Sequence, residues 1–273
     1  MSVPSVEETR LNDLDAIRWS GLPGLLIGQN YARAPIVQAI LEFQVVADAQ
    51  LKVDALRDAA EVETFQVVSE NFNVQGQFGL VDGVVTGETT GDRVGFAFQK
   101  PDGSRIIQAD LGRFSFSWAS QYTDWSDFIN EAESAWLRYR RVSSPTMVKT
   151  IGVRFVNQIP MPRPIVEIKD YLRTSIDISP YLPQGVTNLF MQVDVPLSEG
   201  TSATITSALL AKPNVESPQV ALLLDIDVKR EVSAATEAAE FDALVKETLA
   251  HLRAAKNYVF EACITDATRG LIS

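Results

Sequence analysis

Apolar and polar residues alternate along several segments of the chain. The clearest alternation lies in residues 36–45, where every second position is apolar, and it predicts a strand with one buried and one partly polar face. A second alternating segment, 147–159, ends where Pro160, Pro162 and Pro164 follow, since proline removes a backbone donor. Further strands are expected at 189–197, 202–210 and 219–229.

Two long segments repeat their apolar residues at the helical period instead. In 124–140 the apolar residues at this spacing include Trp136 and Tyr139, and Thr123 is placed to cap the start of the helix. The other long helix is expected at 237–264, and short helices are expected at 51–60 and 168–172.

The middle of the first half reads as a strand meander. Asp82-Gly83 and Asp102-Gly103 are turn pairs that favour the left-handed conformations of tight hairpins. Phe114, Phe116 and Trp118 form one apolar face of a strand, and Gly112 marks a turn or a bulge before it. Residues 106–118 therefore form either one bulged strand or a hairpin. Residues 1–30 are expected to be an irregular lead-in, because breakers interrupt them.

These elements predict an α+β fold in which an antiparallel sheet is packed on one face by the long amphipathic helices 124–140 and 237–264. Strands precede a helix in both 31–160 and 161–273, so we expect two related halves that form one compact unit. The prolines after 159 mark the junction between the halves.

Composition narrows the classes of partner and compartment. The chain has 24 Lys and Arg against 35 Asp and Glu, a formal net charge of -11, which disfavours nucleic acid and anionic membranes and suits a basic protein or a cation. Cys263 is the only cysteine, and the acidic first twenty residues do not resemble a signal peptide. We expect a cytoplasmic protein without a membrane segment.

The residues offer no recognisable catalytic, cofactor or metal motif. His251 and Cys263 fall on one predicted helix, about 18 Å apart at the helical rise, so they cannot form a nucleophilic pair. One histidine and one cysteine are too few for a nitrogen and sulfur metal site. Arg138, Arg140 and Arg141 beside two aromatic residues are better explained by the end of a helix than by nucleic-acid binding.

The polar positions of the predicted strands give the best candidate surface. If the strands share one sheet, these positions line one acidic face, and Arg154 is expected to pair with Glu42 across neighbouring strands. An ordinary solvated sheet face explains the same pattern. The charged members of the candidate face are Glu42, Arg154, Asp194, Asp225 and Asp227.

Four segments together resemble an uncharacterised, sporadically distributed bacterial protein family of unknown function, over about residues 31–265. They are residues 31–42 (YARAPIVQAILE), 113–118 (RFSFSW) followed by Tyr122 and Trp125, 152–157 (GVRFVN) and 260–265 (FEACIT). The resemblance implies an accessory role and no assigned activity. It adds Asn157 and Thr265 to Glu42 and Arg154 as polar positions within apolar elements, and Asn157 joins the candidate face.

The function expected from the sequence is therefore a non-catalytic binding or accessory protein that uses the polar, acidic sheet face to engage an unidentified partner. One alternative is a hydrolase or isomerase that uses the carboxylates of Glu42, Asp225 and Asp227. Another is a small-ligand binder with a cavity between the sheet and the long helix.

Overall fold

The structure is a computed structural model that describes residues 31–81, 84–120, 122–162, 166–198, 200–211 and 220–273. The described strands form an antiparallel sheet in the order β2-β3-β4-β5-β1-β6-β9-β8-β7. The strands are β1 (Ile36–Val46), β2 (Gln66–Val81), β3 (Val84–Gln99), β4 (Arg105–Asp110), β5 (Arg113–Trp118), β6 (Met147–Pro160), β7 (Phe190–Ser198), β8 (Thr201–Ala211) and β9 (Val220–Ala235).

The helices are α1 (Trp125–Ser143), α2 (Ile168–Tyr171), α3 (Phe241–Cys263) and α4 (Asp266–Ile272), with a 3-10 helix, η2 (Val53–Ala59). The predicted α+β class with an antiparallel sheet is confirmed. The short helix α4 was not predicted. None of the described helices is both long enough and apolar enough to cross a membrane.

The chain divides into two compact units that each combine distant segments. Unit 1 contains the described part of Met1–Ala39 together with Ile151–Val232 and Glu240–Ser273, and unit 2 contains Ile40–Thr150 with Ser233–Ala239. The predicted halves, 31–160 and 161–273, follow the order of the chain instead.

Unit 2 holds an aromatic core between α1 and its strands. Phe43 stacks on Trp136 with ring centroids 4.0 Å apart, and Phe114 lies 5.6 Å from Trp136 and 5.2 Å from Tyr139. All four side chains are at most 3% exposed. The alternation of β1 and β5 and the helical period of α1 thus bring their large side chains to one place.

The start of α1 corrects one prediction. The N-cap is Asp124, whose Oδ1 accepts a hydrogen bond from the Asp127 backbone N–H at 3.0 Å, and not Thr123. The Thr123 hydroxyl instead donates to Asp127 Oδ2 at 3.1 Å. The carboxylate of Asp124, one residue later than the predicted cap, therefore satisfies an orphan amide of the first turn.

Residues 106–118 form a hairpin, which decides the alternative that the sequence left open. β4 and β5 pair antiparallel from Arg105↔Trp118 to Ala109↔Phe114, and the chain turns between Asp110 and Arg113. The predicted Asp102-Gly103 turn is also confirmed, since Gly103 has φ +74 and Asp102 Oδ1 accepts from the Ser104 backbone N–H at 2.9 Å. The Asp82-Gly83 pair lies outside the described residues, as does the predicted lead-in 1–30.

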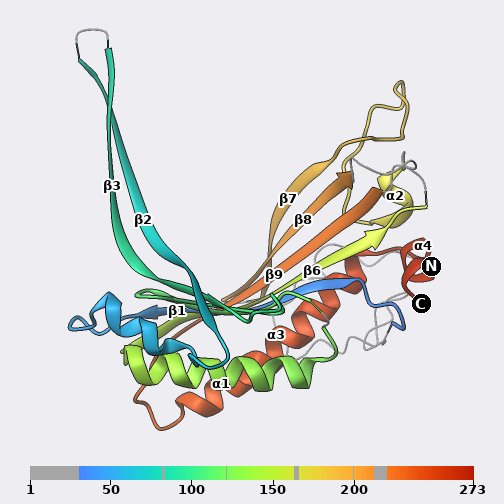
Figure 1. The fold of residues 1–273 in the computed structure, drawn as a ribbon. Coiled ribbons are helices and arrows are strands. Elements are labelled where there is room, and N and C mark those ends of the chain that lie inside the picture. Colours follow the sequence, from blue (N-terminus) through green and yellow to red (C-terminus); the bar gives the residue numbers. More distant parts are fainter. Residues whose placement is uncertain (1–30, 82–83, 121, 163–165, 199, 212–219) are drawn as a thin grey trace. The chain divides into compact units, whose positions relative to one another are not determined.

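β2 and β3 continue together beyond the other strands of unit 2. β3 pairs with β4 only from Gly95 to Gln99, whereas β2 and β3 pair along their full lengths. The outer part of this hairpin, Phe72–Val81 with Val84–Arg93, is a two-stranded arm that extends away from β4 (Figure 1).

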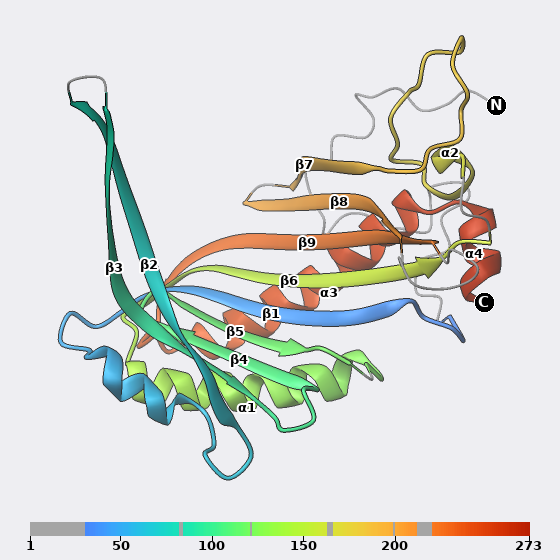
Figure 2. The same ribbon diagram turned by 45° about the horizontal axis from the view of Figure 1, so that its top comes forward.

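In unit 1, β6, β9, β8 and β7 lie side by side (Figure 2). One face of these strands is apolar and buried, with Val153, Leu224, Ile226 and Val228 at most 1% exposed. Two contacts join this face to α3: Lys256 Nζ lies 4.0 Å from the centroid of the Phe155 ring, and His251 Nε2 lies 3.3 Å from Thr201 Oγ1. The opposite face carries most of the candidate residues.

Candidate functional site: a polar sheet face

The register of β7, β8 and β9 aligns polar side chains in two rows across unit 1. Gln192, Thr206 and Asp225 are partners in one row, and Asp194, Thr204 and Asp227 are partners in the next. Since side chains alternate across a strand, both rows point to the same side of the sheet. We call this surface, with Arg154 of β6, the polar face.

Arg154 binds Asp225 at both carboxylate oxygens. Arg154 Nε donates to Oδ1 at 2.9 Å, and Nη2 donates to Oδ2 at 2.5 Å. The Asp225 side chain is 7% exposed and that of Arg154 is 47% exposed. A bidentate, charge-assisted pair of this kind fixes the geometry of both groups and neutralises the most buried acid of the face.

The remaining carboxylates of the face differ in their surroundings. Asp227 lies beside Lys229, with Oδ2 at 2.9 Å from Nζ. Asp194 is exposed and accepts a hydrogen bond from the Thr204 hydroxyl at 2.5 Å. Two of the three acids are therefore paired with a cation, and Asp194 carries the most accessible negative charge.

Glu42 lies in unit 2, on β1. Its Oε2 is 4.0 Å from Nη1 of Arg113, which is a long contact between partly exposed groups. Because Glu42 and Arg154 belong to different units, their predicted pairing stays a prediction.

Asn157 does not belong to the exposed face, which corrects the sequence-based assignment. It is 3% exposed, and its Nδ2 donates to the backbone oxygens of Phe155 at 3.2 Å and Leu224 at 3.0 Å. Asn157 has the parity of the buried Phe155, so its side chain points to the apolar side of β6. Its amide satisfies backbone groups rather than a partner.

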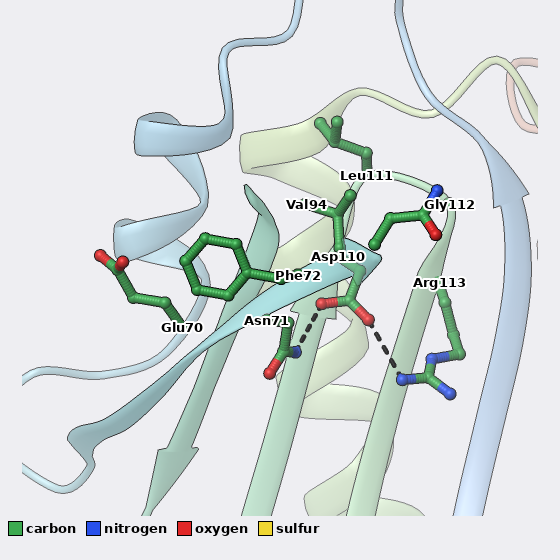
Figure 3. A pocket seen from close by; sticks show the side chains of 9 residues that line it. Glu70, Asn71, Phe72, Val94, Asp110, Leu111, Gly112 and Arg113 are labelled. Carbon is green, nitrogen blue, oxygen red and sulfur yellow. Dashed lines mark hydrogen bonds and ion pairs between the residues drawn. The ribbon is translucent and has the colours of Figure 1, made fainter. Parts of the chain in front are cut away.

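A pocket in unit 2 was not predicted. It holds about 610 Å³ where the arm leaves the sheet, and its lining residues are Glu70, Asn71, Phe72, Asn73, Val94, Asp110, Leu111, Gly112 and Arg113. Figure 3 shows Asp110 at its centre, where Oδ1 accepts from Asn71 Nδ2 at 2.6 Å and Oδ2 from Arg113 Nη2 at 3.2 Å. The sequence contains one signal that could have indicated this pocket: the polar residues Gln108 and Asp110 alternate with the apolar residues Ile107 and Ala109.

The acids of this pocket are already bound. Besides the two side-chain contacts of Asp110, Glu70 Oε1 accepts from Arg57 Nη2 at 3.1 Å and from Arg93 Nη1 at 2.9 Å. These ion pairs hold η2, β2 and β3 together, so both carboxylates that line the pocket have cationic partners.

Unit 1 also contains a buried charge cluster at the C-terminal helices. Arg269 Nη2 donates to Glu261 Oε2 at 3.0 Å, and both side chains are at most 7% exposed. The Tyr31 hydroxyl donates to Glu261 Oε1 at 2.6 Å, and burial together with this carboxylate raises the pKa of Tyr31 to about 12. The cluster attaches the segment near Tyr31 to α3 and α4.

Lys256 of α3 is a titratable group on the apolar side of the unit 1 strands. Burial, with a smaller contribution from the charge of Arg253, lowers the pKa of Lys256 to about 7. The residue is half-buried, and no ion pair of Lys256 is found among the described residues. The Phe155 ring face under its amino group partly compensates the lost hydration of the cation.

Three residues considered in the sequence analysis for chemistry or for nucleic-acid binding are buried: Cys263, Trp136 and Tyr139. Cys263 is 2% exposed, and burial raises the pKa of its thiol. Trp136 and Tyr139 are buried in the aromatic core, so they are not available to stack on bases. Within the described part of the chain, no group of three or more His, Cys, Asp or Glu could hold a metal ion.

Comparison with protein-family models, with curated proteins and with solved structures found no match for this chain. The resemblance seen in the four sequence segments therefore stays a prediction.

Proposed function

We propose that the chain is a non-catalytic binding or accessory protein whose polar face engages a basic partner. The observation that carries the proposal is the alignment of Gln192, Thr206 and Asp225 beside Asp194, Thr204 and Asp227 on one side of three paired strands. Such rows present hydroxyl, amide and carboxylate groups at the regular spacing of a sheet, which suits contact with a second protein surface.

The long helix α3 contacts the buried side of the sheet, and this position would leave the polar face accessible to a partner. Phe155 and Thr201 have the parity of the buried side and contact α3 through Lys256 and His251. The proposal therefore includes the predicted packing of amphipathic helices on the opposite side of the sheet. It also retains the hypothesis that the chain consists of two related halves, because each unit contains one long helix: α1 in unit 2 and α3 in unit 1.

The charge distribution narrows the region of contact. Asp225 is bound by Arg154, and Asp227 lies beside Lys229, so the approach of a cationic group is most favourable at the exposed Asp194. A basic side chain placed there would gain a charge-assisted hydrogen bond without displacing an existing ion pair.

Carboxylate catalysis has less support. A general acid or base must exchange a proton with its substrate, whereas both oxygens of Asp225 accept hydrogen bonds from Arg154. Asp227 is held beside Lys229, and Glu42 belongs to the other unit. No observation assigns these three groups a shared substrate position.

The test compares Asp194→Lys with Glu247→Lys, which makes the same change of charge on an exposed position of α3. Each variant and the natural protein are purified gently from the host and measured by native mass spectrometry. We expect a basic protein to be retained by the natural chain and by Glu247→Lys and lost from Asp194→Lys. Asp225→Lys is unsuitable, because Asp225 is buried beside Arg154.

Two results would contradict the proposal. One is a natural protein that retains no partner at all. The other is a partner that Asp194→Lys retains as well as Glu247→Lys does, since binding would then not depend on the polar face.

A further inference from the structure

The first strand of the sheet, β2, has an outer edge that lacks the usual protection against pairing. β2 is the terminal strand of the sheet order, so the backbone groups along one side have no neighbouring strand among the described residues. Edge strands are commonly protected by charged side chains, by proline, by bulges or by shortness, because unpaired N–H and C=O groups recruit another strand.

The outer half of β2, Phe72–Val81, carries none of these devices. Its sequence, FNVQGQFGLV, contains no charged residue and no proline. It pairs with β3 from Phe72↔Arg93 to Val81↔Val84 without a register shift, whereas the two shifts of β2 lie closer to the sheet, at Val67/Ser69 and Asn71/Phe72. The result is a regular, uncharged edge ten residues long.

Apolar side chains at the described end of this edge are exposed to solvent. Phe72 is 53% exposed and Val74 is 62% exposed, and they occupy alternate positions of the strand. Val67 and Val68, nearer the sheet, are 46% and 54% exposed. Four large apolar residues exposed along one terminal strand are typical of a contact surface rather than of a solvated edge.

The opposite edge of the sheet provides a contrast within the same molecule. β7 contains Asp194 and Pro196, and its pairing with β8 shifts between Pro196 and Ser198. Both a charge and a proline therefore protect this edge, as does the irregularity. Of the two terminal strands of the sheet order, only β2 has an outer segment without charge, proline or register shift.

We propose that the outer edge of β2 pairs antiparallel with the same edge of a second copy of this chain. Two copies that each carry a net charge of -11 repel one another over most of their surfaces, and Phe72–Val81 is a stretch without charge. An antiparallel pairing about a two-fold axis is closed, so one uncharged edge of β2 satisfies the other. The nearest carboxylate of β2, Glu70, is neutralised by Arg57 and Arg93.

Sedimentation across the micromolar range tests the proposal. We expect a reversible dimer, and we expect Val74→Glu to weaken it by about tenfold or more, because a carboxylate would be buried in the new interface. The matched control is Val62→Glu, a change at a valine that is 76% exposed and lies outside the strands. A natural protein that stays monomeric, or a dimer that Val74→Glu and Val62→Glu affect equally, would overturn the proposal.

A cysteine scan provides the second measurement. Single cysteines are placed in turn at positions 72–81, against a background in which Cys263 is buried. Antiparallel pairing about a two-fold axis requires disulfide formation between copies to peak at one position near the axis. A flat profile along the strand would reject the pairing even if a dimer forms.

Discussion

Arg154 Nε lies within 3.0 Å of both carboxylate oxygens of Asp225, although 71 residues separate the two in the chain. The pair joins β6 to β9 on the polar face, and the carboxylate is much less exposed than the guanidinium. Loss of the arginine would leave a nearly buried carboxylate without its counter-charge, whereas loss of the acid would leave a guanidinium that is already half exposed to water.

Removal of the Arg154 side chain should therefore destabilise the protein through Asp225. We expect Arg154→Ala to lower the free energy of unfolding by about 1–3 kcal/mol, since a nearly buried carboxylate would lose its guanidinium. Chemical denaturation measures the change. Lys229→Ala is the control, because its acid, Asp227, is 20% exposed against 7% for Asp225, and this pair should contribute less than about 1 kcal/mol. Equal losses would show that burial of Asp225 has no special consequence.

Glu261 and Asp266 both contact Arg269, and they allow a comparison of a buried with an exposed partner. The Glu261 side chain is 5% exposed and that of Asp266 is 92% exposed. We expect Glu261→Gln to cost about 3 kcal/mol or more, because it leaves a buried guanidinium without its main counter-charge. Asp266→Asn should cost less than about 1 kcal/mol.

Urea denaturation of the two variants decides this comparison. Tyr31→Phe, which removes the hydrogen bond to Glu261, should fall between them at about 1 kcal/mol. An Asp266→Asn variant as unstable as Glu261→Gln would contradict the expectation that burial sets the cost.

Two glycines of β3 should respond oppositely to the same substitution. A Cβ atom at Gly95 would lie 2.1 Å from the Ala109 backbone oxygen, whereas one at Gly91 would meet no atom closer than 3.7 Å. Gly95→Ala should therefore force β3 and β4 apart and cost about 1–3 kcal/mol. Gly91→Ala should be neutral or stabilise by up to about 1 kcal/mol, because it restricts the unfolded chain. Thermal unfolding of both variants checks the difference in sign.

The local patterns of the sequence predicted the elements well, and the reason is that each pattern is contained within its own segment. The alternation around Phe43 predicts a strand with one buried face, and β1 buries Leu41, Phe43 and Val45 as expected. The helical period around Trp136 likewise predicts α1, because a helix that packs on a sheet needs one apolar stripe.

Pairing between distant residues was harder to predict. The sequence cannot give the strand order, and the order decides that Asp225 of β9 becomes a partner of Arg154. The misassignment of Asn157 has the same origin, since a polar residue within a strand can be exposed or can bond to a distant backbone oxygen such as that of Leu224. The arm was also not predicted, because its length depends on where β4 stops pairing with β3.

The last prediction concerns the pH dependence of stability at Lys256. Its pKa is about 7 in the folded protein against an ordinary value of 10.5, so between these values the unfolded chain binds more protons at this site. Its contribution should therefore make the folded state more stable as pH rises from about 7 to 10.5. Below pH 7 the lysine is charged in both states, and the cost of burying the cation is fully present.

Lys256→Met keeps the length and apolar character of the side chain and removes the titration. We expect the variant to have a higher melting temperature than the natural protein at pH 6, and the difference should shrink steadily toward pH 10. Comparison of the two proteins at each pH cancels the titration of all other groups. A difference that is constant with pH would mean that the amino group is as well hydrated, or as well stabilised by the Phe155 ring, in the folded protein as in the unfolded chain.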